Sequence, residues 1–200
     1  VDIEIEIPET AILRASTQYG EIGIEALSGR AEAVTTTGEL KVKSLAGDFR
    51  GETVSGEIHI NDVKGTVSIA TRSGDIHAAH IEKGITANAV SGDVHIREIE
   101  GGKVECKSVS GDAHAEKIGT QAPLEIRAES VSGDVSLKEA KGTIALKAVS
   151  GDVNAQDLVA TNLQAQTVSG DINLRLNEDF VGMMQVNTVS GDTNIGIPKG

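Results

Sequence analysis

The stretch VSGDVHIREIEGGKVECKSVSGDAHAEKI, residues 90–118, contains the phrase Val-Ser-Gly-Asp twice, with the two copies 19 residues apart. Variants of this phrase recur along almost the whole chain, and the glycine of each one serves as a marker of position. The marker glycines are Gly20, Gly38, Gly56, Gly74, Gly92, Gly111, Gly133, Gly151, Gly170 and Gly191. Successive markers are 18 residues apart in five cases and 19 to 22 residues apart in the other four. Because this period is too short for a repeat built from helices, it indicates a repeat built from β-strands.

Each period contains two short stretches in which polar and apolar residues alternate. After Gly56 the residues Glu57-Ile58-His59-Ile60 alternate, and after Gly65 the apolar residues Val67 and Ile69 continue the pattern. Such alternation is typical of a strand with one buried face. Each period therefore predicts two strands joined by turns.

If each period forms one turn of a solenoid, equivalent residues stack in columns about 4.8 Å apart. The column two residues after the markers contains Ile22, Leu40, Ile58, Ile76, Val94, Ala113, Val135, Val153, Ile172 and Thr193. The column four residues after the markers contains Ile24, Val42, Ile60, Ala78, Ile96, Ala115, Leu137, Ala155, Leu174 and Ile195. We therefore predict an all-β fold, a single-stranded parallel β-helix or β-solenoid of about ten coils with roughly 18 residues each.

The whole chain, residues 1–200, is expected to form one domain. Its predicted parts are an N-terminal cap strand at 1–19, repeat coils at 20–190 and a last partial coil at 191–200. A right-handed winding is expected, because a nine-residue half-repeat does not fit the hexapeptide pattern of left-handed β-helices.

The longer intervals between markers predict loops outside the stack. These loops should fall at 98–104, at 119–124, near 160 and at 177–184. The last of them contains Phe180, Met183 and Met184, which can cover apolar surface near one end of the solenoid.

The composition argues against several classes of function. A net charge of −12 without a basic stripe disfavours binding to nucleic acids and docking on anionic lipid. No signal peptide is recognised, and no apolar run reaches the length of a membrane span, so no direct membrane insertion is expected. Cys106 is the one cysteine, which excludes an intrachain disulfide and a site built from several cysteines, and we expect it to be buried.

The residue directly after each marker glycine is acidic in every coil, and in four consecutive coils a histidine follows two residues later. These eight residues are Glu57, His59, Asp75, His77, Asp93, His95, Asp112 and His114. Each carboxylate and imidazole of a pair should face the same way, and a fifth histidine, His80, lies near the same coils.

Two interpretations of these eight residues stay open. In the first, Ser, Gly and Asp simply form the same tight turn in each coil, since Gly allows positive φ and Asp bonds nearby N–H groups. In the second, the stacked carboxylates and imidazoles bind a divalent cation such as Ca²⁺ or Zn²⁺. The calcium-binding β-roll motif G-G-x-G-x-D is absent from the chain.

A carbohydrate-active β-helix enzyme is the least favoured alternative. Such enzymes combine local carboxylates with aromatic subsites, whereas the aromatic residues here are only Tyr19, Phe49 and Phe180. Because the acidic residues repeat in every coil, none of them marks a local active site. We expect no catalytic residues and no cofactor.

The recurring V-S-G-D-[VI] phrase resembles a bacterial domain family of unknown function that is named for adhesins. The ending TVSGDTNIGIPKG and the opening strand that closes on Ile7 and Pro8 share this resemblance. The resemblance implies a parallel β-helix in cell-envelope or surface proteins, an extracytoplasmic location and an adhesive or scaffolding role. It transfers no catalytic residue.

The expected function is that of a non-enzymatic interaction module at the cell envelope or surface. Its flat sides would present columns of polar residues to a protein or cell-surface partner, or to another copy of the chain. A divalent-metal-binding solenoid that uses the acidic and histidine face is the alternative.

Overall fold

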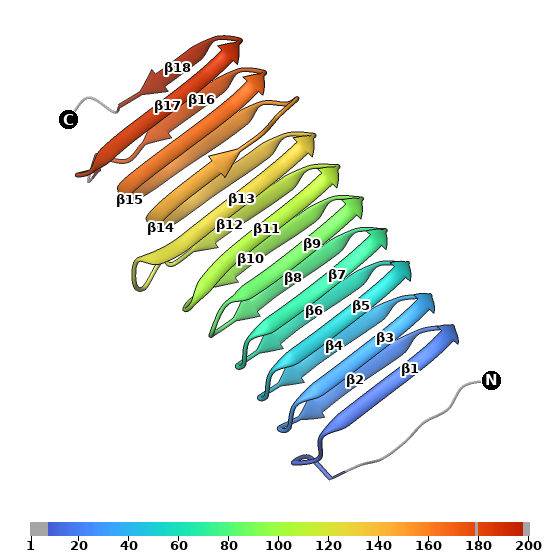
Figure 1. Ribbon diagram of the computed structural model, residues 1–200. Coiled ribbons are helices and arrows are strands. Elements are labelled where there is room, and N and C mark those ends of the chain that lie inside the picture. Colours follow the sequence, from blue (N-terminus) through green and yellow to red (C-terminus); the bar gives the residue numbers. More distant parts are fainter. Residues whose placement is uncertain (1–7, 179, 198–200) are drawn as a thin grey trace.

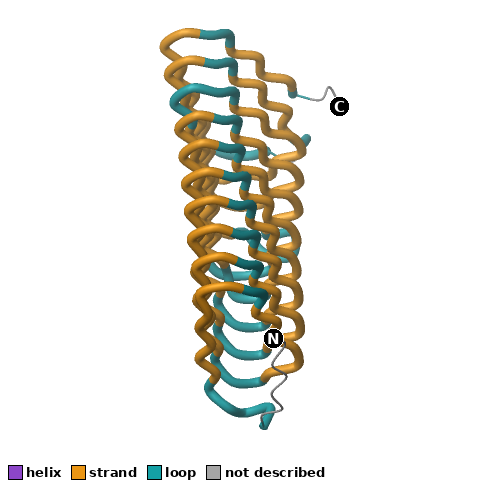
Figure 2. The backbone as a smooth tube through the Cα atoms, turned by 90° about the vertical axis from the view of Figure 1, so that its right-hand side faces the viewer, coloured by secondary structure: helices purple, strands orange, loops and turns teal. Residues whose placement is uncertain are grey.

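The computed structural model describes residues 8–178 and 180–197, and these residues form one elongated stack of β-strands without a helix (Figure 1). The chain winds along two opposed faces, which are joined by short turns (Figure 2). The first face contains β2 (Ile22–Leu27), β4 (Leu40–Leu45), β6 (Ile58–Val63), β8 (Ile76–Ile81), β10 (Val94–Ile99), β12 (Ala113–Ile118), the first parts of β14 (Val135–Lys147) and β15 (Val153–Ser169), β16 (Ile172–Leu176) and β18 (Thr193–Gly196). The second face contains β1 (Leu13–Tyr19), β3 (Ala31–Thr37), β5 (Phe49–Ser55), β7 (Val67–Ser73), β9 (Ile85–Ser91), β11 (Lys103–Ser110), β13 (Leu124–Ser132), the later parts of β14 and β15, and β17 (Met183–Ser190).

The strands on each face pair in parallel with the strands one coil away. On the first face Ile58 pairs with Ile76 and His59 pairs with His77, so equivalent residues stack as expected. The described residues thus confirm the prediction of an all-β parallel β-solenoid of about ten turns. The right-handed winding and the division at residues 19 and 190 stay predictions.

A narrow core of Ile, Val, Leu and Ala runs the length of the stack between the two faces. Phe49 is the largest side chain buried in it. Cys106 is fully buried, as predicted, and burial raises the pKa of its thiol, so the sulfur behaves as a small apolar group. Near the C-terminal end the core columns open to solvent, and Ile195 is 38% exposed.

A left-handed residue in most first-face strands explains why two outward-facing residues in succession precede the last buried one. In β6 the exposed Asn61 and Asp62 come before the buried Val63, and Asp62 has a φ of 58°. The other residues with positive φ at this position are Ala26, Ser44, His80, Glu98, Lys117, Glu139 and Asp157. This backbone step turns the final apolar side chain inward.

The marker glycines form the corner where the second face turns into the first. Gly111 has a φ of 153°, and a Cβ atom there would lie 2.3 Å from the carbonyl oxygen of Gly92 in the coil before. Its amide donates to the carbonyl of Ser132 in the next coil. Buried hydroxyls complete the corner, since Ser130 Oγ donates to the Gly111 oxygen at 2.8 Å. The repeated phrase is therefore a structural corner.

The departures from the 18-residue period fall where the marker spacing predicts them. The turn between β10 and β11, the longer loop between β12 and β13, and the segment between β16 and β17 hold extra residues. A register shift in β14 lies at Gly142/Thr143, opposite residue Thr161 of β15. In the segment after β16, Phe180 and Met184 pack against the core, whereas Met183 is exposed.

Within the described part of the chain, no helix is long and apolar enough to cross a membrane.

Candidate functional site

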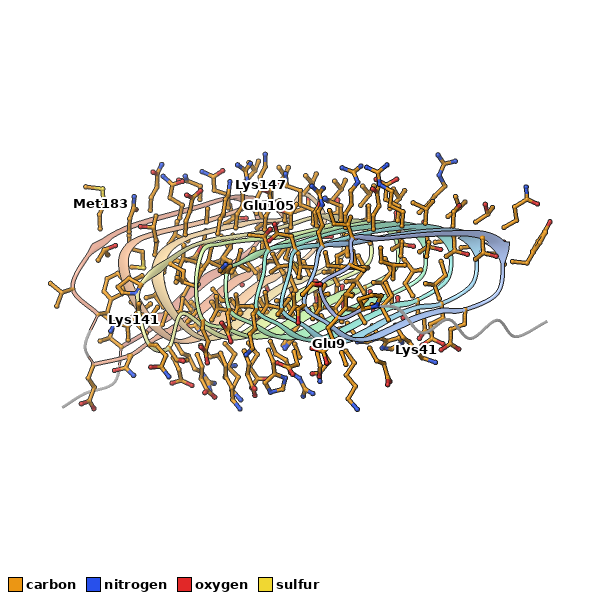
Figure 3. The ribbon with its side chains drawn as sticks, turned by 90° about the horizontal axis from the view of Figure 1, so that it is seen from below. Glu9, Lys41, Glu105, Lys141, Lys147 and Met183 are labelled. Carbon is orange, nitrogen blue, oxygen red and sulfur yellow. The ribbon has the colours of Figure 1, made fainter. Side chains whose placement is uncertain are left out.

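The first face carries an open groove of about 820 Å³ that extends over β2 to β12. Lys41 lines this groove and lies on the opposite side of the flattened stack from Glu105 and Lys147 of the second face (Figure 3). Because the first-face strands pair in register, outward residues at equivalent positions line the groove as columns. Its central column contains Lys41, His59, His77, His95 and His114.

Three of the four histidines of this column stack on one another, as their positions predict, and the fourth is tilted. The ring centres of His59 and His77 are 5.0 Å apart, those of His77 and His95 are 5.1 Å apart, and His114 is tilted at 5.8 Å from His95. Burial and the neighbouring imidazoles His59 and His95 lower the pKa of His77. Burial and His95 lower the pKa of His114. The neutral imidazole is therefore favoured at His77 and at His114.

The aspartates beside these histidines are engaged by the backbone. The carboxylate of Asp75 accepts a hydrogen bond from the amide of Asp93 at 2.8 Å, and Asp93 accepts one from Asp112. The series continues through the corner as Asp112 accepts from Asp134. These bonds support the interpretation that the acidic residues directly after the marker glycines, which we call the acidic column, are part of the turn.

Glu57 behaves differently, because its longer side chain reaches the histidine column. Its Oε2 lies 3.0 Å from His59 Nε2, and Oε1 of Glu39 in the preceding coil lies 3.2 Å from the same nitrogen. Lys41 binds the other oxygen of Glu39 at 2.9 Å and Glu21 at 3.1 Å. Both glutamates raise the pKa of Lys41, which keeps it charged.

The structure thus joins one of the four predicted pairs by a direct contact, Glu57 with His59, and adds Glu39, which the sequence analysis did not select. Glu39 belongs to the same acidic column, but its own coil has Lys41 in place of histidine. A search for neighbours one coil away, rather than two residues away, would have found it. Metal binding by any of these residues stays a prediction.

A second feature that the sequence analysis missed is a row of valines along the corner, two residues before the marker glycines, all of which are exposed except the partly buried Val149. This valine column consists of Val54, Val90, Val109, Val131, Val149, Val168 and Val189. Val90, Val109, Val131 and Val168 are each 45–48% exposed. Arg72 interrupts the column after Val54, and from Val90 onward each coil contributes one valine.

The alternation in the second-face strands could have revealed the valine column. Thr53 and Ser108, three residues before their markers, point inward and are buried, so the next residue must point outward. From Val90 to Val189 the column spans six coils, or about 24 Å at the usual strand spacing.

Comparison with protein families gives one match. The family model described as Toastrack DUF4097 matches residues 16–121 and again residues 64–199. The two ranges overlap, as expected for a chain of equivalent coils to which one model can be aligned in two positions. No curated protein and no solved structure matches the chain.

Proposed function

This chain belongs to the Toastrack DUF4097 family, whose function is unknown, and we propose that it is a non-enzymatic interaction module of the cell envelope or cell surface. In this role it acts as an adhesin or a scaffold that holds a partner protein along its corner. The extracytoplasmic location rests on the resemblance of the Val-Ser-Gly-Asp phrase to bacterial envelope domains.

The valine column is the observation that carries this proposal. Six successive coils each contribute one valine, five of them at least 45% exposed, and these side chains form an apolar strip beside the acidic residues that follow the marker glycines. Contiguous exposed apolar surface is typical of protein interaction sites. Because the strip lies on a rigid corner with fixed spacing, a partner can bind it without ordering a loop.

A different protein fits this strip better than a second copy of the chain. The net charge of −12 makes two copies repel each other, whereas a partner with basic residues beside an apolar strip would be attracted. Asp112 and Asp134 lie three residues after Val109 and Val131, so the acidic column runs beside the valine column.

The non-enzymatic role is supported by the distribution of titratable groups. Acidic residues repeat in the corner, where the amide of the next coil bonds many of them. The interval from Gly111 to Gly133 is the longest between markers, and its extra residues lie in the loop between β12 and β13. This loop, residues 119–123, contains no titratable side chain. Apart from the contact that Glu39 and Glu57 make with His59, neither arrangement provides a paired acid and base for catalysis.

The proposal is tested by capturing envelope proteins of the producing organism on the immobilised chain and repeating the capture with a variant in which Val90, Val109 and Val131 are changed to Thr. These changes keep the shape and strand preference of valine but add hydroxyl groups. We expect the Thr variant to capture at least tenfold less of one specific protein than the wild type does. A variant with Ile at the three positions should capture as much of that protein as the wild type.

Three outcomes would contradict the proposal. The first is equal capture by the wild type and the Thr variant. The second is a concentration-dependent dimer in sedimentation that the Thr changes abolish, which would make a second copy the partner. The third is turnover of an envelope polysaccharide by the purified chain.

A further inference from the structure

We propose that Glu39, Glu57 and His59 form a binding site for a transition-metal dication such as Zn²⁺ in the N-terminal half of the first-face groove. Each residue offers one ligand atom, and these atoms all lie within 4.8 Å of one another. Among the residues that the structure describes, this is the one group of three acidic, histidine or cysteine side chains arranged in this way. The site is separate from the valine column and goes beyond the proposed interaction role.

The distances around His59 match those between ligands that share an ion. Its Nε2 lies 3.0 Å from Glu57 Oε2 and 3.2 Å from Glu39 Oε1. Ligands bound to zinc at about 2.1 Å, at angles between square and tetrahedral, are separated by about 3.0 to 3.4 Å. An ion bound to His59 Nε2 would therefore lie between this nitrogen and the two carboxylates and would take the place of their present contacts.

The kinds of ligand favour a transition metal over calcium. Imidazole nitrogen and carboxylate oxygen are both ligand types of zinc, and three protein ligands leave a further position for water. Calcium takes six to eight oxygen ligands, whereas this group offers two carboxylates and one imidazole. The two carboxylates also balance the charge of a dication.

Side-chain length explains why the site forms here and not in the next coils. Asp75 and Asp93 have short side chains, and the amide of the following coil binds one carboxylate oxygen of each. Glu39 and Glu57 extend past the corner to the histidine column instead. The corresponding histidines His77 and His95 therefore have no such pair of carboxylates among the described contacts.

The surroundings hold the three ligands in place. The amide of Leu40 donates to the carbonyl of Glu57, so the two glutamates are fixed one coil apart. Lys41 binds Oε2 of Glu39 and leaves Oε1 directed at His59. His77 stacks on the ring of His59 with an interplanar angle of 13° and limits its rotation. Such supporting contacts are typical of metal sites.

The test is titration of the chain with ZnCl₂ in a calorimeter, together with thermal melting at several zinc concentrations. We expect one ion per chain and a melting temperature that rises with zinc, because the ion links two coils of the folded state only. His59→Ala and the double variant Glu39→Gln/Glu57→Gln should each weaken binding at least tenfold. His95→Ala, in the same column two coils away, is the matched control and should bind within twofold of the wild type.

The comparison of variants distinguishes this site from the alternatives. If His95→Ala weakens binding as much as His59→Ala does, the stacked imidazoles rather than the carboxylates hold the ion, and the proposal is wrong. If His59→Ala binds like the wild type while the double glutamate variant does not, the site is an oxygen-only cation site. Absence of saturable binding to the wild type would also overturn it. Far-UV circular dichroism without zinc identifies any variant that fails to fold, and His59→Gln then replaces His59→Ala.

Discussion

The marker glycines stack on one another along one edge of the solenoid, so their lack of a side chain is a packing requirement. A Cβ atom on Gly56, Gly92 or Gly170 would lie about 2 Å from the carbonyl oxygen of the marker one coil before. Positive φ and close approach act at the same positions. The sequence predicted a turn at each marker glycine. The structure adds that the carbonyl group of the neighbouring coil leaves no room for a side chain at these positions.

Replacing one marker glycine should therefore be costly. We expect Gly111→Ala to lower the free energy of unfolding by about 3 kcal/mol, since backbone strain and displacement of the Gly92 carbonyl add together. Gly23→Ala is the control: it lies on a strand with nothing within 4 Å of the new Cβ, and should be neutral or stabilising by about 0.5 kcal/mol. Urea unfolding measures both, and equal effects would contradict the account of the corner.

One acidic residue should make stability depend on pH. Oδ1 of Asp48 accepts hydrogen bonds from the amide and the hydroxyl of Thr66, both at 2.8 Å, and these bonds lower the pKa of the carboxyl below its ordinary value of 3.8. The lowered pKa means that the ionised form stabilises the fold above pH 3.8 and that this contribution is lost as the pH falls through the folded-state pKa.

We expect Asp48→Asn to be less stable than the wild type at pH 7 by on the order of 1 kcal/mol, because a neutral amide is a weaker acceptor than a carboxylate. The difference should shrink as the pH falls below 3.8 and through the lowered folded-state pKa of Asp48. Unfolding curves across this range measure it, and a difference that stays constant with pH would contradict the assignment.

The sequence predicted where the residues of the acidic column lie, but it did not predict which groups their side chains contact. The column itself follows from the marker spacing, and so do the buried columns that contain Val94 and Ile96. Side-chain length decides which acidic residues stabilise the turn. The short Asp75 accepts a hydrogen bond from the amide of the next coil, whereas the longer Glu57 reaches a histidine. The left-handed step at Asp62 could not be predicted either, since the residues at that position share no chemistry.

Changing one aspartate of the column should separate hydrogen bonding from charge. Oδ1 of Asp93 accepts from the amide of Asp112 at 2.8 Å. Asp93→Ala leaves that amide without its partner and should cost about 1–2 kcal/mol of unfolding free energy. Asp93→Asn keeps an acceptor and removes a like charge, so it should cost much less. If both variants are equally destabilised in urea unfolding, the charge of the column rather than its acceptors matters.

The whole molecule is a repeat array, so removing one complete coil should be tolerated. Deletion of residues 75–92 removes β8 and β9 and joins Gly74 directly to Asp93, which keeps the alternation of faces. We expect a single cooperative transition with an m-value lower by roughly a tenth. Deletion of residues 75–83 removes half a coil, places two second-face strands in succession and should abolish cooperative unfolding.

The interaction role also belongs to the whole molecule, because the valine column becomes a strip only when successive coils stack. The sequence predicted flat polar sides as the surface for a partner, and it did not predict the apolar corner. Val168, Gln164 and Gln156 all belong to strand β15. Val168 lies on the valine column, Gln164 lies on the second face, and Gln156 lies on the first face. These three exposed positions sample the corner and both faces at one level of the stack.

Photo-crosslinking in the producing organism tests the interaction role most directly. A photoreactive phenylalanine derivative is placed at Val168, at Gln164 or at Gln156, and the crosslinked products are separated by mass. If the valine column is the interaction surface, one protein partner is attached to the chain through position 168 and little or none through the other two. Crosslinks of equal strength from position 164 or 156, or none from position 168, would contradict it.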